Sequence, residues 1–305
     1  YKPSAGLEGG GPTMWWGSIT PDQQPMDDHS LVYDSEALTE SLEILGRPVA
    51  RLNVSADATR ANWVVRISDV APDGQVTQVA GAAINGAHRN STRDPEAIVP
   101  GEVFPLEFEL HLTSWVFQPG HKIRIAISNG MWPMLWPTRE LFTSTLQIGG
   151  EVGARIELPV VPAGEERSPN FRDPAPGPVL EGFETLDAGN ITGYAAITEI
   201  HEDPETGEAY GLATNSGATR RPWGIERFEE EIEHRTDDDN PANTSVTGTY
   251  AITQELADRT LRFESDVSFA SDEENFYLRF DRRVLVDGEL FREKRWDEVI
   301  ERDFQ

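Results

Sequence analysis

FQPGHKIRIAISNGMWPMLW, residues 117–136, predicts a turn, a strand and an aromatic loop, in that order. Pro119 and Gly120 mark the turn, because proline presets φ and glycine accepts a positive φ. In residues 122–128 isoleucine alternates with Lys, Arg, Ala or Ser, which indicates a strand with one buried face. The loop at residues 131–137 is rich in Met, Leu and Trp. Because this apolar surface is costly to leave in water, we expect it to pack against this chain or against a partner domain.

Alternating apolar residues predict further strands on both sides of this stretch. These strands are expected over residues 49–56, 63–67, 75–80, 104–112, 141–148 and 152–160. Asp73-Gly74 predicts a hairpin turn. Pro105 cannot donate to a β ladder, so its strand is expected at a sheet edge or at a bulge. Short strands between Gly and Pro turns, without helical periodicity, predict an all-β fold that begins with a β-sandwich or a jelly roll.

Three segments of the first half resemble one family of enzymes. The matching residues of the quoted stretch are Phe117, Gly120, His121, Ile123, Arg124, Ile125, Ile127 and Ser128. Residues 42–48 and 64–74 resemble two further motifs of the same family, in the same order. Together they resemble the C-terminal, X-Pro dipeptidyl-peptidase type region of the CocE/NonD serine hydrolases. The resemblance implies a non-catalytic, galactose-binding-like jelly roll whose partner is an α/β-hydrolase catalytic domain, which carries the Ser, Asp and His triad.

The second half of the chain predicts a separate all-β unit. We expect an extended linker segment at residues 1–41, the jelly roll at 42–165, a Pro/Gly-rich linker at 166–182 and an acidic second domain at 183–305. The second domain is predicted to be an antiparallel meander or a small barrel. Its strands are expected over residues 194–200, 228–235, 245–253, 260–269, 276–286 and 289–300, with a helix as the alternative for 228–235 and a possible helical turn at the C-terminus.

Composition limits the classes of partner. The net charge is −27, and residues 171–305 hold 32 Asp and Glu against 14 Lys and Arg. This balance argues against a nucleic-acid partner, because phosphates are bound by Lys and Arg. No apolar run approaches the roughly 18 residues of a membrane span, so no membrane partner is expected. The chain begins with Tyr1 and not Met, so we expect a piece of a longer protein.

The sequence predicts no catalytic residue in this chain. A nucleophile elbow requires G-x-S-x-G, and this pentapeptide does not occur. Ser128 comes nearest, but Ala126 replaces the first glycine, so Ser128 is predicted to be an ordinary strand residue. Whether the chain takes part in an enzyme is left open. No cofactor is expected, and no metal site, because residues 237–240 (DDDN) resemble a solvated acidic turn more than a calcium loop.

Five apolar side chains are the predicted contacts with the catalytic domain: Trp15, Trp16, Trp132, Leu135 and Trp136. Large apolar groups on loops are typical of domain interfaces. Gly120, His121 and Arg124 are predicted to have structural roles. Two alternatives stay open. The sandwich could be a carbohydrate-binding or ligand-binding module in which tryptophans stack on sugars, or the acidic second domain could mediate a homo-oligomer.

Overall fold

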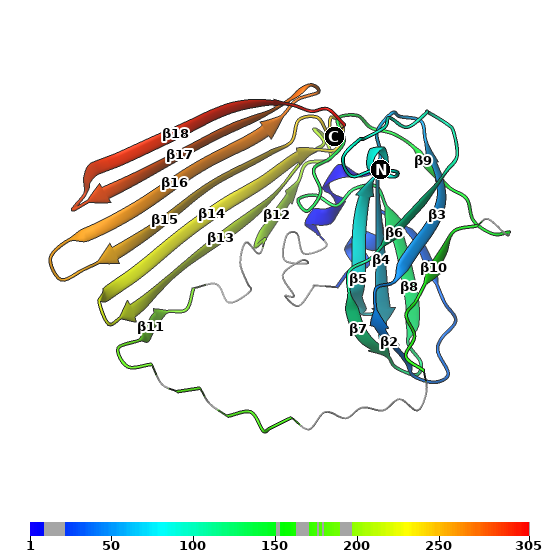
Figure 1. Cartoon of the computed structure of the whole chain (residues 1–305), viewed down its shortest axis with the longest axis horizontal. Coiled ribbons are helices and arrows are strands. Elements are labelled where there is room, and N and C mark those ends of the chain that lie inside the picture. The colour runs from blue at the N-terminus through cyan, green and yellow to red at the C-terminus, as the bar shows by residue number, and fades with distance from the viewer. Residues whose placement is uncertain are drawn as a thin grey trace.

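The structure is a computed structural model that describes residues 1–8, 22–150, 153–162, 171–175, 177–178, 180–189 and 197–304. It consists almost entirely of antiparallel strands in two parts, a β-sandwich and a single large sheet (Figure 1). The all-β fold class predicted from the sequence is therefore confirmed. The jelly-roll connectivity of the first part, and the exact domain boundaries, stay predictions.

The sandwich has two layers. One has the strand order β1 (Leu31–Asp34), β8 (Lys122–Ser128), β4 (Asn62–Val70) and β5 (Val76–Asn85). The other has the order β10 (Arg155–Glu157), β3 (Val49–Ala56) and β6 (Phe104–Glu109), with β9 (Ser144–Leu146) also paired to β3. A separate two-stranded sheet contains β2 (Leu42–Gly46) and β7 (Thr113–Phe117). The short helices here are η1 (Pro3–Leu7), α1 (Gln24–Asp27) and η3 (Gly86–His88).

The core of the sandwich lies between its two layers. Leu52 and Leu106 face it from one layer, and Trp63 and Ile67 face it from the other. The ring of Trp63 meets Phe104 edge to face, with 5.5 Å between ring centroids. Since strand side chains alternate, β3 shows a strict alternation of half-buried and buried residues, as its sequence predicts.

Strand β4 is buried on both faces, and this requires a partner for a charged residue in its centre. Met26 of α1 packs on Val64, and Arg66 is completely buried beside it. Its guanidinium donates to Asp27 Oδ1 at 2.7 Å. Asp27 also accepts from Arg124 at 3.1 Å. Burial lowers the pKa of Arg66, and the charge of Asp27 opposes that shift. This ion network therefore fixes α1 against the outer face of β4.

The second part is an open meander. Its strand order is β11 (Glu184–Asp187), β13 (Glu208–Arg221), β14 (Gly224–Asp237), β15 (Ser245–Glu255), β16 (Thr260–Ser271), β17 (Asn275–Val286) and β18 (Glu289–Glu301), and β12 (Glu199–Glu202) also pairs with β13. Among the described residues β11 and β18 do not pair with each other, so the sheet is not closed into the barrel that we kept as an alternative. Asp287 and Gly288 both have positive φ, which suits the predicted tight turn between β17 and β18.

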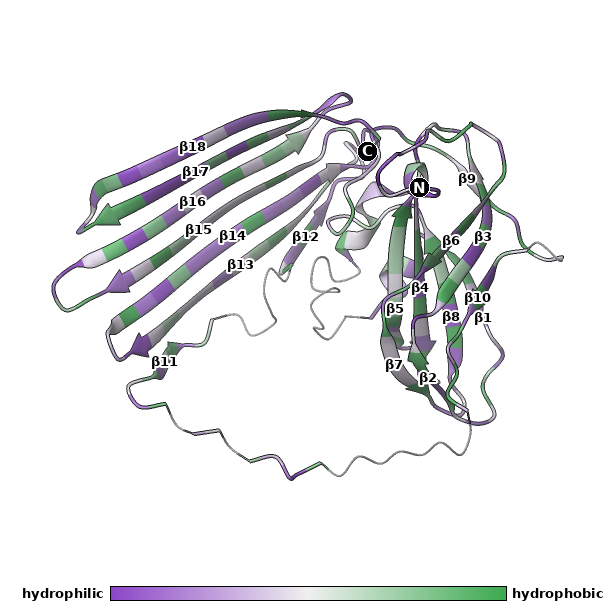
Figure 2. Ribbon diagram, in the orientation of Figure 1, coloured by the Kyte–Doolittle hydropathy of each residue, from purple (hydrophilic) through white to green (hydrophobic). Residues whose placement is uncertain are grey.

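Hydropathy alternates along the strands of this sheet (Figure 2). We call one side the apolar face; its residues include Phe228, Ile232, Ile252, Phe263, Val267, Phe269, Phe280, Val284 and Trp296. We call the other side the charged face; its residues include Glu229, Glu231, Arg262, Glu264, Asp266, Asp281, Arg283 and Arg295. Directly opposite residues share a face, so the strand registers assign these sides.

Several predicted elements have different bounds in the structure. The strand predicted over residues 104–112 ends at Glu109, and β7 follows as a separate strand. The strands predicted over 141–148 and 152–160 are reduced to β9 and β10. Residues 228–235 form part of β14, which settles the choice between strand and helix. Residues 302–304 form no helical turn. Pro105 lies on β6, an edge strand, as predicted.

Replacing Asp27 with Ala is expected to destabilise the fold by about 3 to 5 kcal/mol, because Arg66 would be left as an uncompensated buried charge. The free energy of unfolding in urea measures this loss. The exposed neighbour Asp28 provides the control, and Asp28→Ala should change the free energy by less than about 0.5 kcal/mol. Equal effects of the two substitutions would contradict the role given to the ion network.

Candidate functional site

The aromatic loop that follows β8 packs against the C-terminal sheet of this same chain. Trp132 is 1% exposed and clusters with Leu7 and Ala209. Its ring meets that of His234 edge to face at 6.0 Å. Trp136 meets the rings of Phe269 and Phe276 at 4.9 and 5.5 Å.

Polar contacts surround these rings. Trp136 Nε1 donates to Ser271 Oγ at 3.0 Å. Asp238 accepts from both the backbone N and the Oγ of Ser4, at 2.8 and 2.7 Å. We call this whole contact, between residues 1–8 and 131–137 on one side and the apolar face with its adjoining loops on the other, the sandwich–sheet interface. Both chain ends lie close to it (Figure 1).

The C-terminal residues close the sandwich–sheet interface. Arg302 is 1% exposed and donates to the carbonyl oxygens of Asp272 and Pro137 at 2.8 and 2.7 Å. Its guanidinium also lies 5.0 Å from the ring centroid of Phe276. Arg60 then holds the carbonyl oxygen of Asp303. Residues 302–304 therefore fasten the end of β18 to the sandwich.

The structure places the five predicted contact residues in three different settings. Trp132 and Trp136 contact this chain, which is the first of the two alternatives that the sequence left open. Leu135 is partly buried beside Met131. Trp15 and Trp16 lie outside the described residues. Contact of any of these side chains with a catalytic domain stays a prediction.

The three predicted structural residues lie in and just before β8. Gly120 has a φ of +85°, a conformation that favours glycine. The Nδ1 atom of His121 is 2.7 Å from Asp69 Oδ1 on β4. Asp69 also accepts from Trp115 Nε1 at 2.8 Å. Arg124 forms ion pairs with Asp34 and Asp27, and the hydrogen bonds that it donates to Asp34 are the largest factor that raises its pKa.

Sequence reasoning missed several residues on which these contacts depend, namely Arg66, Asp69, Ser271 and Arg302. Only Arg66 leaves a clear signal, since it interrupts the apolar run WVVRI and a charge in such a strand needs a buried partner. Asp69 lies in the segment 64–74 that resembles a family motif, whereas Ser271 and Arg302 are ordinary surface-type residues in sequence. Their importance arises from partners that are 46 to 165 positions away.

The described residues that resemble catalytic or metal-binding groups have other partners. Ser128 is buried on β8 and its hydroxyl donates to Gly130 O at 3.2 Å. In the acidic turn, Asp237 Oδ1 accepts from the backbone N of Asp239 and Asn240. Among the described residues, no group of three or more His, Asp or Glu side chains is placed to hold a metal ion.

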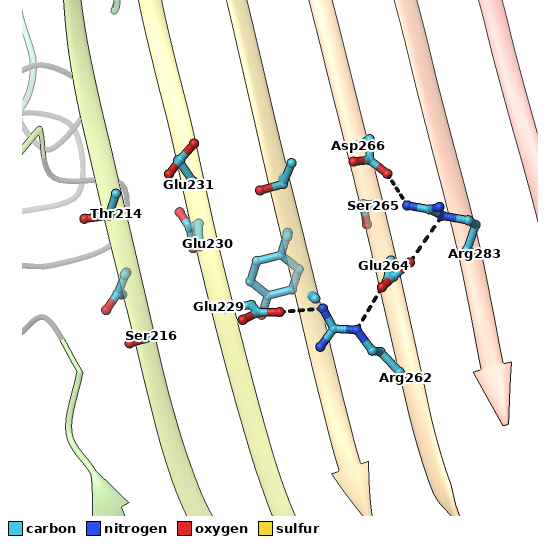
Figure 3. Close-up of a pocket in the computed structure, with 14 residues that line it drawn as sticks. Thr214, Ser216, Glu229, Glu230, Glu231, Arg262, Glu264, Ser265, Asp266 and Arg283 are labelled. Atoms are coloured by element: carbon cyan, nitrogen blue, oxygen red, sulfur yellow. Dashed lines mark hydrogen bonds and ion pairs between the residues drawn. The ribbon is translucent and has the colours of Figure 1, made fainter. Parts of the chain in front are cut away.

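A trough of about 620 Å³ lies on the charged face of the sheet (Figure 3). Arg262 bonds Glu264 at 2.8 Å and also bonds Glu229. Arg283 bonds Asp266 at 3.0 Å. Because both arginines among its described lining residues are already neutralised by carboxylates, these residues offer no free cation to an anionic ligand. It is best explained as a solvated ladder of cross-strand ion pairs.

An apolar cleft of about 460 Å³ opens at the edge of the sandwich between β1 and β10. Its walls are mainly aliphatic: Leu52, Ile123, Ile125, Ile127, Leu146, Ile156 and Leu158. Asp34, Ser35 and Arg155 also line it, and Asp34 is paired with Arg124. The cleft has the size and apolar lining of a small-molecule site.

Buried nitrogens without partners make the sandwich–sheet interface sensitive to pH. Within the part of the chain that the structure describes, neither ring nitrogen of His234 has a hydrogen-bond partner, and neither does Trp132 Nε1. Burial lowers the pKa of His234 to about 4, from an ordinary value of 6.5. The unfolded chain therefore binds more protons than the folded chain between these two pH values.

The free energy of unfolding should consequently fall as the pH decreases from 6.5 to 4, and His234 should account for roughly 3 kcal/mol of that fall. His234→Phe keeps a ring against Trp132 and removes the titrating group. Urea unfolding at several pH values should therefore show a shallower decrease in this variant. Parallel pH profiles for the two proteins would contradict the assignment.

In the part of the chain that the structure describes, no helix has the length and apolar character required to cross a membrane.

Comparison with known proteins gives a family match for the first half of the chain. Residues 7–151 match the X-Pro dipeptidyl-peptidase C-terminal non-catalytic domain. The chain is 30% identical over 164 residues to a Mycobacterium bovis protein named as a serine esterase, covering 46% of this chain and 25% of that protein. It is 32% identical over 114 residues to the cocaine esterase of Rhodococcus, covering 37% and 20%.

A solved α-amino acid ester hydrolase is 25% identical and covers 49% of this chain and 29% of its own, with a TM-score of 0.46. The chain thus spans about a quarter of the length of the curated relatives it matches. Residues 7–151 of this chain are thus similar to the X-Pro dipeptidyl-peptidase C-terminal non-catalytic domain, and this region is related to the CocE/NonD esterases.

Proposed function

We propose that this chain is the C-terminal portion of a serine hydrolase, and that it braces the α/β-hydrolase catalytic domain and forms part of the wall of its cleft. The observation that carries the proposal is the family match over residues 7–151, together with relatives named as esterases that are about four to five times longer than the matching region. The reaction of the whole enzyme would be cleavage of an ester or amide acyl bond through an acyl-serine intermediate.

The chemistry of acyl transfer indicates which groups the catalytic domain would supply and what this chain would supply. Acyl transfer needs an activated serine and donors aimed at the oxyanion, held to within fractions of an ångström. The sequence contains no nucleophile elbow, so these groups would belong to the catalytic domain. A rigid support is what this chain can supply, since the sandwich and the sheet are fastened together by Trp132, Trp136 and Arg302.

A protease site inserted immediately before Tyr1 of the full-length enzyme tests the bracing role. After cleavage under native conditions the two fragments should co-elute in gel filtration and keep the esterase kcat/KM of the uncut enzyme, because the contact is a surface and not merely a tether. Separation of the fragments, with full activity and unchanged Tm in the catalytic fragment alone, would refute bracing.

A second candidate function is supported by the apolar cleft between β1 and β10. Its lining is aliphatic, and Tyr33 is the only aromatic residue among the described residues that line it. Sugars stack on aromatic rings, so the cleft favours an aliphatic ligand over a carbohydrate. In this alternative the sandwich would be a binding module for acyl chains.

Calorimetric titration of this chain with decanoate tests the alternative. Binding with a Kd below about 1 mM is expected if the cleft is a site, and Leu158→Lys should abolish it by placing a charge among the aliphatic side chains. Leu45→Lys is the matched control, because Leu45 is exposed on β2 and lies outside the cleft. Equal binding by both variants would locate the ligand elsewhere.

A further inference from the structure

The two faces of the C-terminal sheet differ in how their cations are neutralised, although Arg221 on the apolar face is paired with Glu226. On β13–β18, every Arg on the charged face forms an ion pair with a carboxylate: Arg220, Arg227, Arg235, Arg262, Arg279, Arg283 and Arg295. Arg282, Arg292 and Lys294 form no ion pair among the described residues, and the registers place all three on the apolar face. The unpaired positive charge of this sheet is thus concentrated on one side.

These three cations are close together and repel one another. Arg282 is directly opposite Lys294 across β17 and β18, and Arg292 is opposite Val284, two positions further along. Like charges at directly opposed positions destabilise a strand pair. In a chain of net charge −27, carboxylates to neutralise them are plentiful, yet none forms an ion pair with them among the described residues. Such an arrangement is expected where an acidic partner supplies the missing charge.

Apolar side chains surround this basic strip. Phe280 and Trp296 stack on each other with 5.4 Å between ring centroids, and Lys294 Nζ lies 4.3 Å from the ring centroid of Trp296. Phe263 is 36% exposed. A sheet with one apolar face is stable in water when a second layer covers that face. An uncovered apolar patch with charges at its edge is typical of a protein interaction surface.

One end of the apolar face is already covered by the aromatic loop of the sandwich. Trp132 and Trp136 cover His234, Phe269 and Phe276, and the apolar face continues from there through Val267 and Phe280 to Trp296. A partner domain that contacts the sandwich could therefore also cover the remaining, adjoining part of the apolar face.

We propose that the uncovered part of the apolar face, on β16–β18 around Phe263, Phe280, Trp296 and the basic strip of Arg282, Arg292 and Lys294, is the docking surface for the catalytic domain, which meets it with carboxylates set among apolar side chains. This inference rests on the proposed function and identifies where the bracing contact is made. An anionic bilayer is disfavoured as the occupant, because residues 171–305 carry a large excess of Asp and Glu that an anionic surface would repel.

Zero-length cross-linking identifies the occupant directly. A carbodiimide joins a lysine amine to a carboxylate in direct contact, and this chain has only three lysines, Lys2, Lys122 and Lys294. In the full-length enzyme Lys294 should link to an Asp or Glu of the catalytic domain. Lys122 is exposed on β8 and serves as the internal control for general reactivity. A Lys294 link to a second copy, detected by mixing isotope-labelled and unlabelled protein, would overturn the proposal, and so would a Lys294 that stays unlinked.

Charge reversal separates this inference from the bracing role itself. In the enzyme cut before Tyr1, Arg282→Glu combined with Lys294→Glu should weaken the association of the two fragments at least about tenfold. Arg295→Glu reverses a neighbouring charge on the opposite face and should leave the association within about twofold. If the wild-type fragments associate but both variants bind equally well, the docking surface is wrong while bracing stands. If the wild-type fragments separate, the proposed function itself fails.

Discussion

The burial of Trp132 and Trp136 against the apolar face of the C-terminal sheet is the interaction on which the organisation of this chain depends. The rings meet His234, Phe269 and Phe276 edge to face, which is the favoured geometry for aromatic side chains. Apolar contact alone would permit sliding. The hydrogen bonds of Trp136 to Ser271 and of Arg302 to two carbonyl oxygens add direction, so the sandwich and the sheet are held at one angle.

Because Trp132 and Trp136 pack within this chain, the aromatic loop at residues 131–137 is interpreted differently than from sequence alone. A loop of Met, Trp and Leu that follows a strand of the sandwich is a reasonable contact for a catalytic domain, yet Trp132 and Trp136 are already buried against the C-terminal sheet of the same chain. A bracing surface then has to be found elsewhere, and the uncovered apolar face is the best candidate. The loop would support the catalytic domain indirectly, by fixing the sheet that touches it.

Among the described residues, basic side chains that lack an ion-pair partner are distributed unevenly between the two faces of the C-terminal sheet. On the charged face, carboxylates and guanidiniums pair in water, and Arg66 pairs with Asp27 on the outer face of β4, where an unpaired buried charge would be far more costly. The exposed pairs add little stability and keep the charged face soluble. The unpaired cations on the apolar face are the exception, and an exception on a surface with exposed aromatic residues is explained most simply by a missing partner.

The sequence alone determined the elements that depend on local chemistry. Alternation predicted β3, β4, β8 and the strands of residues 245–300, and positive φ at Gly120 and Gly288 matches turns marked by glycine. The alternation of apolar residues did not predict β13, because this strand has Gly and Ala where other strands have large apolar residues. Gly211 leaves room for Leu7 and Ile197, and a Cβ at this position would approach both side chains to about 3 Å. Only the tertiary structure decided that Trp136 meets Ser271 and that Arg302 meets Pro137, since pairs 135 and 165 residues apart leave no periodic signal in the chain.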